Sequence, residues 1–286
     1  MGDVPETSPG VGEDQDDPFV PLRSLLPLAS DQRLRGRERE IAEHIDRHRE
    51  MGHRPPRRAR GLSRSDIVAA AIAVADAEGA DAVSMRRIAR ELGVGAMSLY
   101  WHVASKEELL HLMLERLNSE TEVPEPTGDW RADLGRYARN VRTALLCHPW
   151  AIDVVGSGPP SGPNNARNGE RLLASLDGLG IPLSTRMQIV TTVATYVLGA
   201  VLREVQEIRW RHAADEARAA MTGEEADGLR AEFYKRIRQS GHYPHIVRLM
   251  DEGIDPDAPE TRDERFEFGL DCVLDGIAAR LPAGRG

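Results

Sequence analysis

The chain has 286 residues, enough for about two domains, and a hydrophobic content of 41% is sufficient for a core. Cys147 and Cys272 are its two cysteines and have no spacing typical of a metal site, so we expect a reducing cytoplasm, no metal and no cofactor. The acidic N-terminus lacks the apolar core of a signal peptide. The longest uncharged stretch, 187–202, is shorter than the roughly 20 apolar residues of a membrane span, so no membrane contact is expected.

The net charge of −9 is unevenly distributed along the chain. Residues 1–53 carry 7 basic and 12 acidic residues, and residues 107–286 carry 21 basic and 29 acidic ones. Residues 54–106, in contrast, carry 9 basic and 5 acidic residues. A positive segment within an acidic chain is typical of a surface that contacts phosphates, although the asymmetry alone is a weak signal.

The composition of residues 1–60 predicts a disordered or basic N-terminal extension. The first 17 residues contain six acids and neither lysine nor arginine, which is typical of a disordered tail. The apolar patch 18–28 either docks on the rest of the chain or belongs to the tail. In the polar helix expected over 31–51, His44 and His48 are four apart, but no third ligand is evident, so a solvated helix face is favoured over a metal site.

The segment from Arg54 to Arg64 has five arginines and no acid, and Pro55 and Pro56 keep it extended. One interpretation is a basic arm that follows phosphates or enters a minor groove. The other is a soluble linker, and the sequence favours neither.

Two amphipathic helices are predicted between Leu62 and Leu92. The first ends at Gly79, and the second begins after Ser84, whose side chain can cap it. Gly93 then permits the left-handed turn that a helix-turn-helix needs. The expected inward positions of the first helix are Ile67, Ala70, Ala71, Val74 and Ala77, and those of the second are Met85, Ile88, Ala89 and Leu92.

A short third helix is predicted over about 95–102. Leu99 and Val103 can point inward, which leaves a hydroxyl, two large aromatic rings and an imidazole facing outward. An exposed surface of this composition indicates a docking partner, and a DNA groove suits it. The predicted outward residues are Ser98, Tyr100, Trp101 and His102.

The next helix connects this unit to the rest of the chain. Ser105 is expected to begin it, and Glu108 stands three residues later, which predicts a capping box. The helix has an apolar side up to Leu117, and a linker is expected over 118–129.

Helical spacing continues to the end of the chain, and no strand pattern is present, so the fold class predicted is all-α. The apolar arc of the long helix expected over about 189–205 is too wide for one packing partner, which predicts cover on two sides. Residues 211–228 are either an extension of that helix or a connector. The helices expected span 130–147, 164–179, about 189–205, 229–237, 243–250 and 262–281.

The run SMRRIARELGVGAMSLYWHVASKEELL, residues 84–110, resembles the N-terminal domain of the TetR family of bacterial transcriptional regulators. The segments ALLCHPW, YVLGAVLREVQE and FEFGLDCVLDGIAARL more weakly resemble the regulatory domain of tetracycline-repressor-type members. The resemblance implies a helix-turn-helix DNA-binding domain at 61–118 and a ligand-binding and dimerisation domain at 128–282, after the extension 1–60.

By this resemblance, Arg86 reaches a base or a phosphate, and aromatic and basic side chains hold the DNA backbone or thymine methyls. Four positions that vary among relatives would read bases, and they offer little hydrogen bonding here. Readout is therefore expected to depend on Arg86, Ser98 and apolar contact with thymine methyls. The implied DNA-binding set is Ser84, Arg86, Gly95, Ala96, Met97, Ser98, Tyr100, Trp101, His102 and Lys106.

The resemblance also implies a homodimer built on a four-helix bundle, which places two recognition helices in successive major grooves. A small-molecule effector would bind in the body, where six residues bring aromatic or polar tips to apolar helices. For any single one of the six, the favoured alternative is core or interface filling. They are Tyr137, Trp150, Thr192, Tyr196, Arg203 and Trp210.

Tetracycline itself is not the expected effector. Where the name-giving repressor uses His, Asn, Phe and Thr side chains for a magnesium–drug complex, this chain has Tyr137, Val141, Val155 and Gly158. The position of the magnesium-linked histidine falls on Val155. A metal-linked effector is therefore not expected either.

The function predicted is a repressor that binds a palindromic operator on double-stranded DNA as a dimer and is released by an effector. The alternative is a ligand-independent DNA-binding protein or helical adaptor. An enzyme is disfavoured, because the adjacent Cys147 and His148 diverge by about 100° on a helix and cannot form a dyad. The run 156–158, Gly-Ser-Gly, also lacks the context of a nucleophile elbow.

Overall fold

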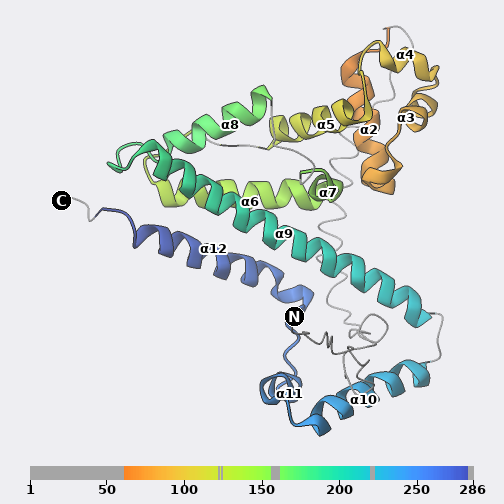
Figure 1. Cartoon of the computed structure of the whole chain (residues 1–286), viewed down its shortest axis with the longest axis vertical. Coiled ribbons are helices and arrows are strands. Elements are labelled where there is room, and N and C mark those ends of the chain that lie inside the picture. The colour runs from red at the N-terminus through yellow and green to blue at the C-terminus, as the bar shows by residue number, and fades with distance from the viewer. Residues whose placement is uncertain (1–60, 122, 124, 156–161, 220–222, 283–286) are drawn as a thin grey trace, which may run out of the picture. The chain divides into compact units, whose positions relative to one another are not determined.

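The computed structural model describes residues 61–121, 123, 125–155, 162–219 and 223–282, and within these ranges the chain forms helices and no strands (Figure 1). The all-α prediction is confirmed. The described residues divide into two compact units, 61–207 with 258–282 and 208–257.

The first helices of the larger unit form a small head. Its elements are α2 (Arg64–Glu78), the 3-10 turn η1 (Ala80–Ala82), α3 (Met85–Leu92), α4 (Ala96–Tyr100) and α5 (Lys106–Glu120). Ser63 and Asp66 form a capping box before α2, and the hydroxyl of Ser84 accepts the N–H of Arg87 at 3.2 Å before α3. Gly93 ends α3 with φ 66° and ψ 31°, the left-handed conformation that glycine adopts without strain.

A continuous core holds the head together. Side chains from α2, α3, α4 and α5 fill it, since α2 packs on both α3 and α5. One predicted position is wrong, because Ala77 is exposed while Val68 and Ala75 are buried. The buried face of α2 is rotated toward these residues because it must face two helices. The core includes Ile67, Val68, Ala71, Val74, Ala75, Val83, Met85, Ile88, Ala89, Leu99, Val103, Leu109 and Met113.

Helix α5 differs from the expectation in its end and in one hydrogen bond of its capping box. The helix continues to Glu120, so the predicted linker begins later than residue 118. At its start, Ser105 accepts the N–H of Glu108 at 3.1 Å as predicted. The carboxylate of Glu108, however, accepts the N–H of Ala104 at 2.6 Å. The reciprocal half of the predicted capping box is thus displaced by one residue.

The body of the larger unit begins with α6 (Trp130–Cys147), which has the bounds predicted, followed by α7 (Trp150–Val155), which was not predicted. Pro149 permits a helix to restart immediately, because proline is tolerated at a helix start. Next, α8 (Pro163–Ala174) ends earlier than the expected Leu179. The larger unit is completed by α9 (Leu183–Ala219) up to Glu207 and by α12 (Arg262–Ala278).

Only one side of α9 is buried within the protomer. Its valine and isoleucine positions at spacings of four are buried, whereas Leu183, Met187 and Leu202 are 65%, 51% and 44% exposed. The predicted cover on two sides is therefore not present in a single copy. By length and composition alone, residues 183–217 could cross a membrane, a test that core helices of soluble proteins also pass. The buried positions are Ile189, Val193, Val197, Val201 and Val205.

An aromatic contact fixes α9 against α12. The hydroxyl of Tyr196 donates to the carbonyl of Phe266 at 2.6 Å, and the two rings lie 5.7 Å apart. Gly269 makes this approach possible, because a Cβ there would overlap the tyrosine ring.

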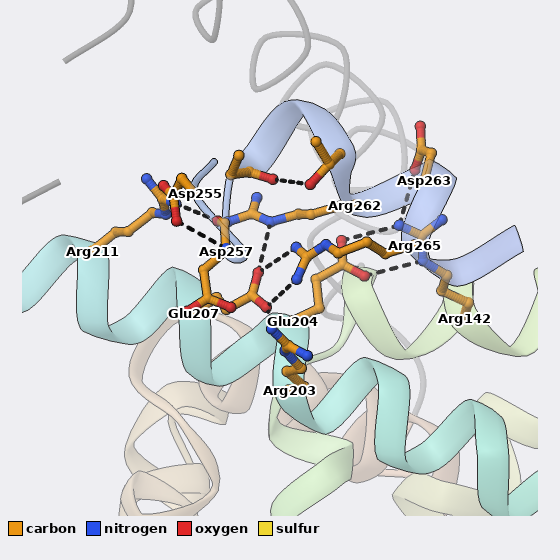
Figure 2. Close-up of polar contacts among 12 residues, drawn as sticks. Arg142, Arg203, Glu204, Glu207, Arg211, Asp255, Asp257, Arg262, Asp263 and Arg265 are labelled. Atoms are coloured by element: carbon orange, nitrogen blue, oxygen red, sulfur yellow. Dashed lines mark hydrogen bonds and ion pairs between the residues drawn. The ribbon is translucent and has the colours of Figure 1, made fainter. Parts of the chain in front are cut away.

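Two carboxylates on α9, those of Glu204 and Glu207, form ion pairs with neighbouring helices (Figure 2). Both oxygens of Glu204 accept from Arg142 of α6 at 3.1 Å, and Arg142 also donates to Asp263 at 2.9 Å. Glu207, only 5% exposed, accepts two bonds from Arg265 at 2.8 and 2.9 Å. Paired in this way, the two buried carboxylates escape the cost of an isolated charge.

The smaller unit contains the end of α9, α10 (Gly223–Ser240) and α11 (Pro244–Asp251). Phe233 and Ile237 are its buried apolar side chains. Arg211 pairs with Asp255 at 3.3 Å and also donates to the carbonyl of Asp257 (Figure 2). The extension of α9 past residue 211 is observed up to Ala219, and α10 is longer than the helix predicted over 229–237.

Candidate DNA interface and effector region

The short helix α4 has the orientation predicted for a recognition helix. Leu99 and Val103 are 0% and 1% exposed and anchor it to the head. On the opposite side, Trp101, Met97 and Tyr100 are 87%, 73% and 47% exposed. Three large side chains that face solvent so close together are typical of a surface that contacts another molecule.

Backbone bonds, rather than a side-chain cap, hold α4 in place. The residue before it, Gly95, makes no side-chain cap, and its carbonyl accepts the N–H of Ser98 at 2.9 Å. After the helix, the carbonyl of Leu99 accepts the N–H groups of His102 and Val103, both at 2.9 Å. The outward side chains of α4 therefore take no part in holding its backbone.

The other predicted DNA-binding residues surround this helix. Two neighbouring arginines on α3 differ: Arg86 is exposed, whereas Arg87 pairs with Glu78 at 2.7 Å and Glu91 at 2.6 Å. Arg86 is therefore the better placed of the two for phosphates or base edges. Of the rest, Ser84, Gly95, Ser98 and His102 are exposed, and Ala96 and Lys106 are partly buried.

Trp150, a predicted effector contact, is buried and forms a hydrogen bond with the head. It is 2% exposed, and its indole N–H donates to Oδ1 of Asp76 at 2.7 Å. Nδ1 of His148 lies 2.8 Å from the same oxygen. Burial, and next the charge of Asp76, raise the pKa of the neighbouring Cys147 thiol. The sequence analysis missed Asp76, because a single acid on the first helix has no pattern that predicts a distant partner.

The remaining predicted effector residues have separate surroundings. Burial raises the pKa of Tyr137, which packs against the core, and Tyr196 makes the contact with α12 described above. Thr192 is exposed and its hydroxyl donates to the carbonyl of Gln188 at 2.7 Å. Arg203 pairs with Glu207 at 3.0 Å, and Trp210, in the smaller unit, is 65% exposed. Their contact with an effector stays a prediction.

A second connection between head and body involves Glu115 of α5, which sequence analysis also missed. Helix α8 has no side-chain cap of its own. Its first N–H groups, those of Asn164 and Asn165, donate to the two carboxylate oxygens of Glu115, both at 3.0 Å. The negative charge at the start of α8 thus comes from another helix, which fastens the body to the helix that leaves the head.

In the described part of the chain, no group of three His, Cys, Asp or Glu residues could hold a metal ion. The candidates His44 and His48 lie outside the described residues. So do the acidic tail, the apolar patch 18–28, most of the basic segment 54–64 and Gly158.

Family comparisons agree with this geometry. Residues 67–113 match the family model for bacterial regulatory proteins of the tetR family. Residues 123–281 match the model for the tetracyclin repressor-like C-terminal domain. The protein is therefore a helix-turn-helix DNA-binding transcriptional regulator. It belongs to the TetR family, which is a family of regulators and not of enzymes.

Several similar proteins are transcriptional repressors by name. The chain is 33% identical over 250 residues to the HTH-type transcriptional repressor DrrR1 of Streptomyces coeruleorubidus, covering 86% of this chain and 89% of that protein. It is 27% identical over 231 residues to the repressor Rv1353c of Mycobacterium tuberculosis, covering 78% and 83%. Among solved structures, ActR of Streptomyces coelicolor in complex with actinorhodin matches with TM-score 0.62 and 29% identity, covering 77% and 97%.

Proposed function

We propose that the protein is a cytoplasmic repressor that binds a palindromic operator as a homodimer and leaves it when a small-molecule effector binds. The observation that carries the proposal is the outward surface of α4, with Met97, Tyr100 and Trp101 exposed above the buried Leu99 and Val103. Several relatives are repressors by name, which supports repression as the direction of control. In this proposal the DNA-binding domain is 61–118 and the regulatory domain 128–282.

The exposed apolar residues of α9 and α12 support a dimer. Leu183, Met187 and Leu202 on α9 and Phe268 on α12, which is 72% exposed, leave two helices of the body incompletely covered. A two-fold axis that pairs these helices with a second copy would complete a four-helix bundle. Two copies of α4 would then lie about 34–36 Å apart, the spacing of successive major grooves on one face of DNA.

An organic effector that needs no metal ion suits the body best. A similar protein, ActR, has been solved in complex with actinorhodin, and the resemblance places Val155 where the tetracycline-type metal site would need a histidine. Such an effector must bind the released state more tightly than the DNA-bound state, since only unequal affinity shifts the equilibrium. The alternative, a DNA-binding protein or helical adaptor without an effector, predicts no such release.

The test begins with footprinting of the full-length protein beside its own promoter and the divergent neighbour. A protected palindrome is expected, and a reporter behind it should be silenced when the protein is expressed. Organic compounds are then screened for loss of protection. Activation of the reporter, or protection that no compound reduces, would contradict repression or effector control respectively.

The dimer is tested separately by sedimentation. Phe268→Arg, which places a charge on the exposed face of α12, should shift the protein toward a monomer and abolish protection of the palindrome. The matched variant Phe268→Leu keeps an apolar side chain and should remain dimeric. A wild-type protein that sediments as a monomer at micromolar concentration would rule the dimer out.

A further inference from the structure

Three arginines surround the carboxylate of Glu207 at the junction of α9 and α12 (Figure 2). Arg265 donates to both of its oxygens, at 2.8 and 2.9 Å, and Arg203 donates to one of them at 3.0 Å. Arg262 lies further away, with its Nε 3.5 Å from Oε2 of Glu207. One negative charge therefore faces three guanidinium groups.

The acids beside these arginines are fewer than the arginines. Glu204 and Asp263 pair with a fourth arginine, Arg142, at 3.1 and 2.9 Å. The group has four guanidinium groups and three carboxylates, so its net charge is positive and it attracts anions. We call it the arginine cluster, and it consists of Arg142, Arg203, Arg262 and Arg265 with Glu204, Glu207 and Asp263.

Arg262 is the member of the arginine cluster with the fewest hydrogen bonds. Its side chain is 13% exposed, and its buried Nε has no hydrogen-bond partner. The other N–H groups of its guanidinium donate no hydrogen bond to any described residue. Its contact with Glu207, at 3.5 Å, is longer than the roughly 2.7–2.9 Å of a charge-assisted hydrogen bond.

A comparison with similar arginines shows that this arrangement is unusual within the described part of the chain. Three other arginines have a buried Nε without a partner, but each of them donates a hydrogen bond through another nitrogen. Proteins rarely leave a buried charged donor without an acceptor, so Arg262 is expected to take one from outside the chain. The three others are Arg186, Arg211 and Arg265, and their acceptors are Asp177, Asp255 and Glu207.

The chemistry of the missing acceptor follows from the guanidinium group. Its N–H donors form a planar fork that matches two oxygens of a carboxylate or a phosphate. We infer that Arg262 binds such an oxyanion and that the effector is an acidic small molecule which carries it. This inference rests on the proposed function, because it names the chemical class of the proposed effector. The positive charge of the cluster also disfavours a metal-linked effector.

The arginine cluster is accessible to solvent at Arg203. This residue is one of the predicted effector contacts, and its side chain is 58% exposed, compared with 30% for Arg265 and 13% for Arg262. An anion in solution therefore meets a cation of the cluster at the surface, and the least satisfied arginine belongs to the same group. Desolvation at Arg262 then strengthens the ion pair relative to one at the surface.

The first experiment tests the full-length protein without DNA. Benzoate is the probe, and benzamide is its uncharged analogue of similar shape. Sodium chloride keeps the ionic strength constant, since screening alone changes ion pairs. Benzoate at tens of millimolar should raise the unfolding temperature Tm by about 2 °C, whereas benzamide should leave it unchanged. Inorganic phosphate is tested in the same way.

Variants assign the effect to Arg262. Arg262→Gln should abolish the benzoate shift, and Arg262→Lys, which keeps the charge but not the planar fork, should retain a smaller one. Without a probe, Arg262→Gln should have the same Tm as the wild type or a higher one, because it removes a charge that forms no hydrogen bond. The matched control is Arg131→Gln, which also removes one positive charge next to α12 but breaks pairs with Asp271 and Asp275. It should keep the full benzoate shift.

Release of the operator then tests the class of the effector. Acidic compounds are compared with their methyl esters by footprinting. An effective acid should act at a concentration about tenfold lower than its ester, as expected when charge-assisted hydrogen bonds are lost. Arg262→Gln should need about tenfold more of the acid, and its operator affinity without compound should equal that of the wild type. Release by inorganic phosphate would identify the free ion as the effector, and release by organic acids alone would identify a larger molecule.

Two results would overturn the inference. One is the absence of a benzoate shift in the wild type, or a shift of the same size with benzamide or in Arg262→Gln. The other is release by an uncharged compound that acts equally on the wild type and Arg262→Gln. If no compound of either class released the operator, the proposed effector control would fail instead. The benzoate shift would still decide whether Arg262 binds an oxyanion, so the two failures are distinguishable.

Discussion

The indole N–H of Trp150 donates to a carboxylate oxygen of Asp76 at 2.7 Å, which joins the first helix of the head to α7 of the body. The same oxygen lies 2.8 Å from Nδ1 of His148, so the end of α6 and the start of α7 both contact one acid of the head. The Asp76 carboxylate is 20% exposed, so few waters can bond to it. Its two partners supply hydrogen bonds in place of those waters. The contact therefore joins two elements of the body to one side chain of the head.

Trp150→Phe is expected to destabilise the protein by about 1–3 kcal/mol, because it removes the donor and leaves Asp76 partly buried with one partner fewer. Urea unfolding measures the effect. Trp101→Phe is the matched control, since that ring is 87% exposed and its loss of an N–H should leave stability unchanged. Equal stability of Trp150→Phe and the wild type would show that the bond has no energetic role.

Tyr100→Ala and Lys106→Ala are expected to weaken binding to all DNA sequences to a similar extent, because both side chains are proposed to hold the backbone. For Lys106→Ala, the slope of log affinity against log salt should fall by about one per lost phosphate contact. Titrations of operator and scrambled duplexes over a range of salt concentrations measure both effects. A loss confined to the operator would assign these residues to base reading instead.

Glu207→Gln is expected to cost about 3 kcal/mol of folding free energy. The wild-type carboxylate is 5% exposed and pairs with Arg203, Arg262 and Arg265, so neutralising it leaves arginines without their counter-charge. The matched control is Glu232→Gln, whose carboxylate pairs with Lys235 and Arg236 but is 51% exposed.

The control should lose less than about 1 kcal/mol, as exposed ion pairs do. Both variants are compared by urea unfolding at neutral pH. If the two losses were equal, the buried carboxylate would have no special role in fixing α9 to α12.

Gly162→Ala is expected to loosen α8 from α5. The glycine has φ 141°, a conformation that L-residues rarely adopt, and a Cβ there would overlap the carboxylate of Glu115. The start of α8 would lose its cap, at a cost of about 1–3 kcal/mol. Gly169→Ala on the same helix meets no atom within 4 Å and should be neutral or stabilising by up to about 1 kcal/mol.

Hydrogen exchange at the first turn of α8 distinguishes the two variants. Faster exchange there is expected in Gly162→Ala and not in Gly169→Ala. Unchanged exchange in both would show that Glu115 is dispensable as a cap.

Cys147 is expected to react slowly with thiol reagents in the folded protein. Burial, and to a smaller extent the charge of Asp76, raise the pKa of its thiol, so less of the reactive thiolate is present at pH 8. A Cys272→Ser variant isolates the signal of Cys147. Its rate should increase several-fold in urea, and a rate that is the same folded and unfolded would contradict the burial of this thiol.

The sequence predicted those elements whose signals are local. Ser84 and Gly93 define the ends of α3, and apolar spacing gave the bounds of α6 as they are observed. Leu99 and Val103 were correctly predicted to face inward. The all-helical class follows from the same periodicity.

The sequence did not predict contacts between residues that are far apart in the chain. Asp76 and Glu115 are single acids on helical surfaces, and nothing adjacent to either indicates a partner 74 or 49 residues away. The sequence likewise did not predict that Trp150 lies against α2 and forms a hydrogen bond with Asp76. In the proposed dimer, a second copy would cover the exposed face of α9, and the sequence of one chain does not show which residues that copy would contact.

The absence of any side-chain cap on α4 has a consequence for evolution. Because the backbone of this helix is held by Leu99, Val103 and main-chain bonds, the outward positions 97 and 98 contribute little to folding. A gene duplicate could therefore acquire a different target site by single substitutions there without passing through an unstable intermediate. Paralogues that share this scaffold are expected to diverge first at these two positions.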